Sequence, residues 1–154
     1  MKMFIYTIVA LVIIIGIVLI VYSVASRKQP ELGLQNGQLR PCPATPNCVC
    51  SDHQVEDAYV EPLPYTTAAE QAWDRIKLVI SETGGAVVTE EAGYLRVVYK
   101  TPLLRYVDDV EFRQDKTKQL IHVRSASRVG SSDLGANRKR IEKIRRAFDI
   151  SMNR

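Results

Sequence analysis

The chain has 154 residues, a net charge of +4, and charged side chains at 25% of its positions. Residues 138–154 hold seven basic residues against two acidic ones, so the positive charge lies at the C-terminal end and the rest sums to −1. The sequence shows no internal repeat, which excludes a repeat architecture. Without the apolar segment and the linker described below, about 115 residues remain, the size of one ordinary domain.

The first predicted element is an apolar helix. Residues 3–26 carry no charged side chain and are mostly Ile, Val and Leu. At about 1.5 Å per residue such a helix reaches about 36 Å, enough to cross a hydrocarbon core of about 30 Å. A cleavable signal peptide is the alternative, since residues 23–25 have small side chains, but its apolar region would span only about 7–15 residues. We therefore predict a retained single-pass anchor, with membrane lipid as its partner.

The orientation of this anchor is not decided by charge. Lys2 and the amino terminus on one side balance Arg27 and Lys28 on the other. Cys42 and Cys48, however, lie close together in a proline-rich loop, which suits a disulfide formed in an oxidising compartment. We therefore expect the soluble part to lie outside the cytoplasm.

A polar linker is predicted over residues 27–39, which contain Pro30, Gly33 and Gly37. The soluble domain is expected to follow over residues 40–154. It should be an α+β domain, as the segments described below indicate.

The cysteines allow two interpretations. A seven-residue ring closed by Cys42 and Cys48 would stabilise the fold by about 2–2.5 kcal/mol. Together with Cys50 and His53 the same cysteines form a candidate three-sulfur, one-nitrogen zinc site, although the spacing matches no common pattern. We favour the disulfide, with Cys50 unpaired or intermolecular, and we predict no metal and no cofactor.

The clearest soluble helix is predicted over residues 67–83. Thr67 and Glu70 form a capping box at its start, and Gly84 and Gly85 end it. Apolar residues recur between them at helical spacing.

The remaining elements alternate with short turns. Four strands are predicted, over residues 86–89, 94–100, 107–113 and 120–128. A last helix begins at Ser132 or Asp133, with an apolar stripe of Leu134, Ile141, Ile144 and Phe148. Consecutive strands with short breaks make an antiparallel meander, so we predict a sheet of four or five strands with two helices packed on one face.

Polar residues collect on one face of the last two strands. Alternation places His122, Arg124 and Arg128 on one face, and Asp109 and Glu111 share a face of the preceding strand. One interpretation is a hydrolase in which His122 is a general base oriented by an acid, with arginines holding an anionic substrate. The other is a ladder of ion pairs, each contributing roughly 0.2–1 kcal/mol. We favour the ladder, because no catalytic motif supports the enzyme.

The C-terminal segment offers further candidates. Asp133 or Ser132 would cap the last helix, where free amides suit an anion. Asn137 falls within the apolar stripe and should tie the helix to the strand loop. The last helix has a basic face that includes Arg138, and the simplest interpretation is that this face is exposed to solvent. If it binds a partner, anionic lipid suits it better than nucleic acid, which we do not expect as a partner. The candidate binding residues are Arg124, Arg128, Asp133, Asn137 and Arg138.

Several motifs resemble a family known as domain of unknown function 1499, over about residues 39–149. They are Leu-Arg-Pro-Cys-Pro (39–43), Pro-Asn-Cys-Val (46–49), Asp-Asp-Val-Glu-Phe (108–112), Val-Arg-Ser-Ala-Ser-Arg-Val-Gly (123–130) and Asp-Leu-Gly with Asn-Arg (133–138). The resemblance implies an exported or membrane-attached protein of bacteria or photosynthetic organelles, which points to a periplasmic location in a bacterial envelope. It implies no activity. Cys50 stands where the family usually has Ser.

The sequence thus leads to three functional hypotheses. The first is an anchored binding or envelope-associated module, whose partners would be envelope proteins or an anionic ligand. The second is a hydrolase using His122, Asp109 and Glu111. The third is a metal-binding module.

Overall fold

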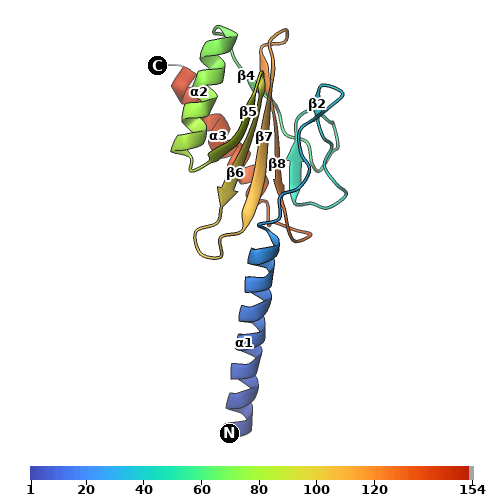
Figure 1. Cartoon of the computed structure of the whole chain (residues 1–154), viewed down its shortest axis with the longest axis vertical. Helices are drawn as coiled ribbons and strands as arrows, with labels where there is room; N and C mark the ends of the chain where they lie inside the picture. The colour runs from blue at the N-terminus through green and yellow to red at the C-terminus, as the bar shows by residue number, and fades with distance from the viewer. Residues whose placement is uncertain (153–154) are drawn as a thin grey trace.

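Helix α1 spans Lys2–Ala25 and projects from the rest of the protein as a rod (Figure 1). The structure is a computed structural model that describes residues 1–152, so Arg154 of the predicted domain lies outside the described residues. The most apolar window of α1 has a mean hydropathy of 3.2, and none of that window is buried. By length and composition α1 can cross a membrane, a property that signal sequences share.

The domain is built on an antiparallel sheet of six strands, confirming the α+β class with a slightly larger sheet. Its strand order is β3-β8-β7-β6-β5, and β4 also pairs with β8. The two additional strands, β3 and β4, are too short to give a sequence pattern and form because β8 offers them a free edge. The strands are β3 (Cys48–Cys50), β4 (Leu63–Pro64), β5 (Ala86–Glu91), β6 (Tyr94–Lys100), β7 (Val107–Asp115) and β8 (Leu120–Ser127).

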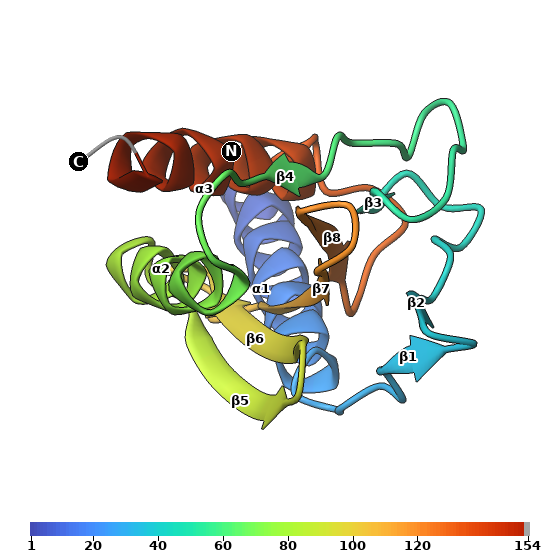
Figure 2. The same ribbon diagram turned by 90° about the horizontal axis from the view of Figure 1, so that it is seen from above.

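Two helices cover one face of this sheet, as predicted (Figure 2). They are α2 (Ala69–Glu82) and α3 (Ala136–Met152). Their apolar stripes pack with the inward side chains of β6, β7 and β8 into one core. The largest fully buried side chains of that core are Phe112, Phe148, Leu63, Leu95, Ile76, Ile80, Ile121, Ile141 and Ile144.

The ends of α2 differ in how well they were predicted. The helix begins after Ala68 with no side-chain cap, so the predicted capping box is wrong: the Thr67 hydroxyl lies near the Ala68 carbonyl instead. The predicted end of α2 at Gly84 and Gly85 is confirmed. Gly84 has a φ of +92°, and a Cβ on Gly85 would lie 2.7 Å from the Tyr99 ring, so a side chain does not fit there.

Helix α3 begins later than predicted. Leu134 and Gly135 have φ values of +53° and +77°, which no helix interior adopts. Leu134 therefore leaves the predicted apolar stripe and is 89% exposed. Asp133 does cap the helix, because its carboxylate accepts hydrogen bonds from the Gly135 and Asn137 amides at 3.0 and 2.7 Å.

The segment predicted as a linker packs against the sheet. It contains a small hairpin of β1 (Leu34–Gln35) and β2 (Gln38–Leu39), and Leu39 is fully buried. The Gly33 amide donates a hydrogen bond to Glu111 Oε1 at 3.0 Å. Residues 33–39 thus lie over the sheet face that α2 and α3 leave open.

Candidate functional site

The sheet face opposite the two helices, here called the polar sheet face, is rich in charged and titratable side chains, and seven of them define it. The strand register places Glu111 opposite Arg124 and Arg113 opposite His122. The predicted meeting of acids and bases therefore occurs, but the side chains are largely buried, with Glu111 0% and Asp109 2% exposed. The seven residues are Arg96, Asp109, Glu111, Arg113, His122, Arg124 and Arg128.

Glu111 has partners on both oxygens of its carboxylate. The Tyr94 hydroxyl and the Gly33 amide donate to Oε1 at 2.7 and 3.0 Å, and Arg124 Nη1 donates to Oε2 at 3.1 Å. Burial raises the pKa of Tyr94 far above its usual range, and the Glu111 carboxylate adds to that shift. The phenol therefore stays a donor, and Glu111 is fully engaged in the fold.

Asp109 lies between two guanidinium groups. Arg96 donates to Oδ1 from Nε and Nη2 at 3.1 and 2.9 Å. Arg128 donates from Nε to Oδ2 at 2.6 Å and from Nη2 to Oδ1 at 2.9 Å. Arg128 also donates to the backbone oxygens of Ser26 and Arg27, at the end of α1. This pair therefore joins the sheet to the apolar helix.

His122 does not contact either acid predicted for it but lies against Asp52. Its Nδ1 is 2.8 Å from Asp52 Oδ1, and Arg113 donates to both Asp52 oxygens at 2.6 and 2.9 Å. Burial opposes ionisation of Asp52, but hydrogen bonds from His122 and Arg113 outweigh it and hold the pKa of Asp52 well below its usual range. Asp52 is thus a permanent anion at the centre of this cluster.

The geometry does not give this His–Asp pair access to a substrate. His122 Nε2 is buried, and no partner within residues 1–152 forms a hydrogen bond to it. Five surface clefts in the described part of the chain have volumes of about 270–590 Å³, and none of these five is lined by His122, Asp109 or Glu111. The polar sheet face is an internal network of ion pairs, in which each carboxylate is held by at least one arginine.

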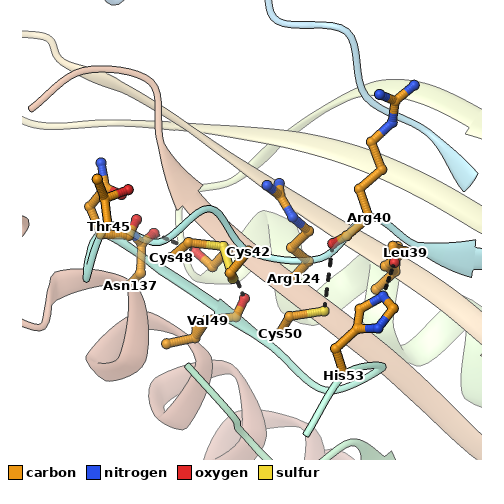
Figure 3. The surroundings of a disulfide bond; sticks show 12 residues. Leu39, Arg40, Cys42, Thr45, Cys48, Val49, Cys50, His53, Arg124 and Asn137 are labelled. Atoms are coloured by element: carbon orange, nitrogen blue, oxygen red, sulfur yellow. Dashed lines mark hydrogen bonds between the residues drawn. A yellow bond between two sulfur atoms is a disulfide. The ribbon is translucent and has the colours of Figure 1, made fainter. Parts of the chain in front are cut away.

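The predicted disulfide between Cys42 and Cys48 is present, with a Cα–Cα distance of 5.6 Å (Figure 3). Two of the four candidate zinc ligands are therefore bonded to each other, and His53 Nε2 lies 2.8 Å from the Leu39 carbonyl. Residues 1–152 contain no group of three metal-ligating side chains suited to an ion. Cys50 is free and 1% exposed, and burial raises the pKa of its thiol.

Asn137 ties α3 to the sheet, as its place in the apolar stripe predicts. Its Nδ2 donates to the Asn47 carbonyl at 2.8 Å and to Ser127 Oγ at 3.1 Å, and its Oδ1 accepts from Ser125 Oγ at 2.6 Å. Arg138 lies one residue on and donates to the backbone oxygens of residues 57 and 59, both at 2.8 Å. Both candidate binding residues therefore hold parts of the domain together.

Another site lies where α1 meets the domain, and we call it the anchor groove. It is a cleft of about 330 Å³. Tyr106 donates from its hydroxyl to the Leu19 carbonyl at 3.3 Å, and the Val107 amide donates to Ser26 Oγ at 3.2 Å, so the walls are held in place. The groove is lined by Tyr22, Thr101, Tyr106, Asp108, Ser127, Val129, Gly130, Ser132, Asp133, Leu134 and Ala136.

Two members of the polar network were not predicted from the sequence, Asp52 and Arg96, whereas alternation does place Arg113 on the face of Asp109 and Glu111. A signal for Arg96 exists, since alternation along its strand puts it on the face that pairs with Glu111. Asp52 has no such signal, because it follows the short strand β3 and reaches the face only through the pairing of β3 with β8.

Comparison with known proteins gives a match to one protein family. A family model described as "Protein of unknown function (DUF1499)" matches residues 38–148. No curated protein and no solved structure shows significant similarity to the chain. The matched segment includes the disulfide loop, the whole sheet and most of α3, so the match covers the domain rather than α1. The chain therefore belongs to the DUF1499 family.

Proposed function

We propose that the protein is a single-pass anchored module that works outside the cytoplasm and acts by binding a ligand in the anchor groove. The apolar helix supports the anchor, and the Cys42–Cys48 disulfide supports an oxidising location. A periplasmic place in a bacterial envelope agrees with both features.

The binding role is supported mainly by the contrast between the polar sheet face and the anchor groove. On the polar sheet face every carboxylate is neutralised by an arginine and shielded from solvent. Such a network stabilises a fold but leaves no free group for catalysis at a surface. The groove, in contrast, is open and combines aromatic, aliphatic and hydroxyl side chains, as small-molecule sites do.

The groove favours a small, partly apolar ligand. Its two acids are already engaged, because Arg140 donates to the Asp108 carboxylate and Asp133 caps α3. A ligand would therefore meet mainly Tyr22, Tyr106 and Leu134, with hydroxyl groups at the margin. An anionic ligand is disfavoured here, since the walls carry acids and no basic side chain.

A site-specific photocrosslinker tests this role in the full chain. Benzoylphenylalanine at Val129, in the groove, should yield an adduct of discrete mass when membranes that contain the protein are irradiated. The same group at Thr117, in the exposed turn between β7 and β8, is the matched control and should yield none. A small molecule captured only at position 129 supports the proposal. A protein adduct, or equal labelling at both positions, would count against the groove as a ligand site.

A further inference from the structure

The end of the domain nearest α1 lies at the depth of the membrane surface. If Lys2 marks one interface, a hydrocarbon core of about 30 Å takes about 20 helical residues and ends near residue 23. Leu19 then lies about four residues, or roughly 6 Å, inside the core boundary. Because the Tyr106 hydroxyl is bound to the Leu19 carbonyl, the loop that carries Tyr106 reaches the lipid interface.

Two loops flank the end of α1 on this side of the domain (Figure 1). We call them the anchor-side loops: residues 101–106, between β6 and β7, and residues 128–135, between β8 and α3. Each presents a leucine to solvent, Leu103 at 88% and Leu134 at 89% exposure. A single exposed leucine needs no explanation, but two that flank an apolar helix at one end of a domain form a surface suited to lipid.

The polar residues around these leucines also fit an interface. Tyr22 and Tyr106 lie at the level where membrane proteins place aromatic side chains. Arg27, Lys28 and Arg105 are exposed near the same end, where basic side chains meet anionic headgroups.

The domain is fixed at this height rather than tethered by a loose segment. Ser26 is fully buried, accepts from the Val107 amide on its hydroxyl, and accepts from Arg128 on its carbonyl. These bonds join the last turn of α1 directly to β7 and to the segment after β8. The anchor-side loops therefore have no freedom to stand away from the bilayer.

We propose that the anchor-side loops dock into the interface of the bilayer, with Leu103 and Leu134 entering the boundary between headgroups and acyl chains. The anchor groove is lined by residues of both loops, so we assign membrane lipid, bound through its uncharged part, as its ligand class. This inference rests on the proposed function in two respects: α1 must span the membrane, and the groove must hold a ligand.

Tryptophan depth measurements on the full chain test the docking. Trp73 is the only tryptophan in the chain and gives the baseline spectrum. Leu103→Trp and Leu134→Trp report on the two loops, Ile14→Trp on the centre of α1, and Thr117→Trp on the opposite end of the sheet. Each variant is reconstituted in phosphatidylcholine and phosphatidylglycerol vesicles whose acyl chains carry bromine either near the glycerol or near the chain end.

Docking predicts that shallow bromine quenches Leu103→Trp at least about two-fold more than Thr117→Trp, with emission shifted to shorter wavelength. Leu134→Trp should behave in the same way, and Ile14→Trp should be quenched best by deep bromine. If Ile14→Trp is quenched but both loop tryptophans match Thr117→Trp, the docking is wrong while the anchor stands. If Ile14→Trp is not quenched, the spanning helix itself is wrong. All four substituted side chains are exposed, so folding is preserved, as thermal melts will verify.

Discussion

Buried charges on the polar sheet face stabilise the protein only when each acidic side chain is paired with a basic one. The Asp52 side chain is 1% exposed and is bound by Arg113 and His122, so its charge is compensated where little solvent reaches it. A buried ion pair adds little over an apolar pair, but removing one partner is costly because the other stays buried and unpaired. The single residues of this network therefore matter for folding.

Asp52→Asn should lower the free energy of unfolding at pH 7 by about 2–3 kcal/mol, because Arg113 and His122 lose the carboxylate that they share. The pKa of Asp52 is held well below its usual range in the folded state, so its contribution is complete above about pH 4 and is lost as the pH falls through the folded value. The variant should therefore lose less stability than the parent on acidification. Urea denaturation at several pH values measures both effects.

Glu70→Gln is the matched control for that measurement. Glu70 is also paired with a cation, Lys116, at 2.9 Å, but both side chains are well exposed. Its removal should leave stability unchanged within error. Equal losses in the two variants would contradict the account of the buried network.

Cys50 should not react with iodoacetamide in the folded protein, because its thiol is buried and burial raises its pKa. Mass spectrometry should find no adduct under native conditions, one adduct in denaturant without reductant, and three after reduction. Rapid native alkylation would show that the thiol is accessible. Two or more adducts before reduction would show that the Cys42–Cys48 bond is absent.

At the scale of elements, the long helices and strands could be predicted because their patterns are set by local periodicity. The ends of α2 and α3 could not be predicted equally well. Ala68 rather than Thr67 occupies the capping position, and the positive φ of Leu134 delays α3 until Ala136. Strands β3 and β4 form only through pairing with β8, an interaction distant in sequence that leaves no local pattern.

Asn137→Ala should destabilise the domain by about 1–3 kcal/mol, because the Asn47 carbonyl keeps only the Ser127 amide as a donor and the Ser125 hydroxyl loses its acceptor. Thermal or urea unfolding of the purified chain measures the loss. Lys139→Ala, on the exposed side of the same helix, should have no measurable effect. A tolerated Asn137→Ala would mean that α3 is held by its apolar stripe alone.

At the scale of the whole molecule, the domain is fixed on the end of α1 through Ser26, Tyr106 and Arg128. The sequence predicted the helix and the domain separately but placed a linker between them, because hydrogen bonds over about a hundred residues have no local signature. The anchor groove is lined by Tyr22 of α1 together with residues of the domain that are distant in sequence, which explains why it was not predicted. The proposed insertion of α1 in a membrane would place the candidate site beside the lipid surface.

The location of the domain is tested most directly by a C-terminal fusion of the full chain to alkaline phosphatase, an enzyme that becomes active only in an oxidising compartment. The end of α3 lies far from α1, so the fusion does not disturb the junction (Figure 1). We predict high phosphatase activity in intact bacteria and no fluorescence from a matched fusion to a protein that fluoresces only after folding in the cytoplasm. An inactive phosphatase together with a bright fluorescent fusion would contradict the account.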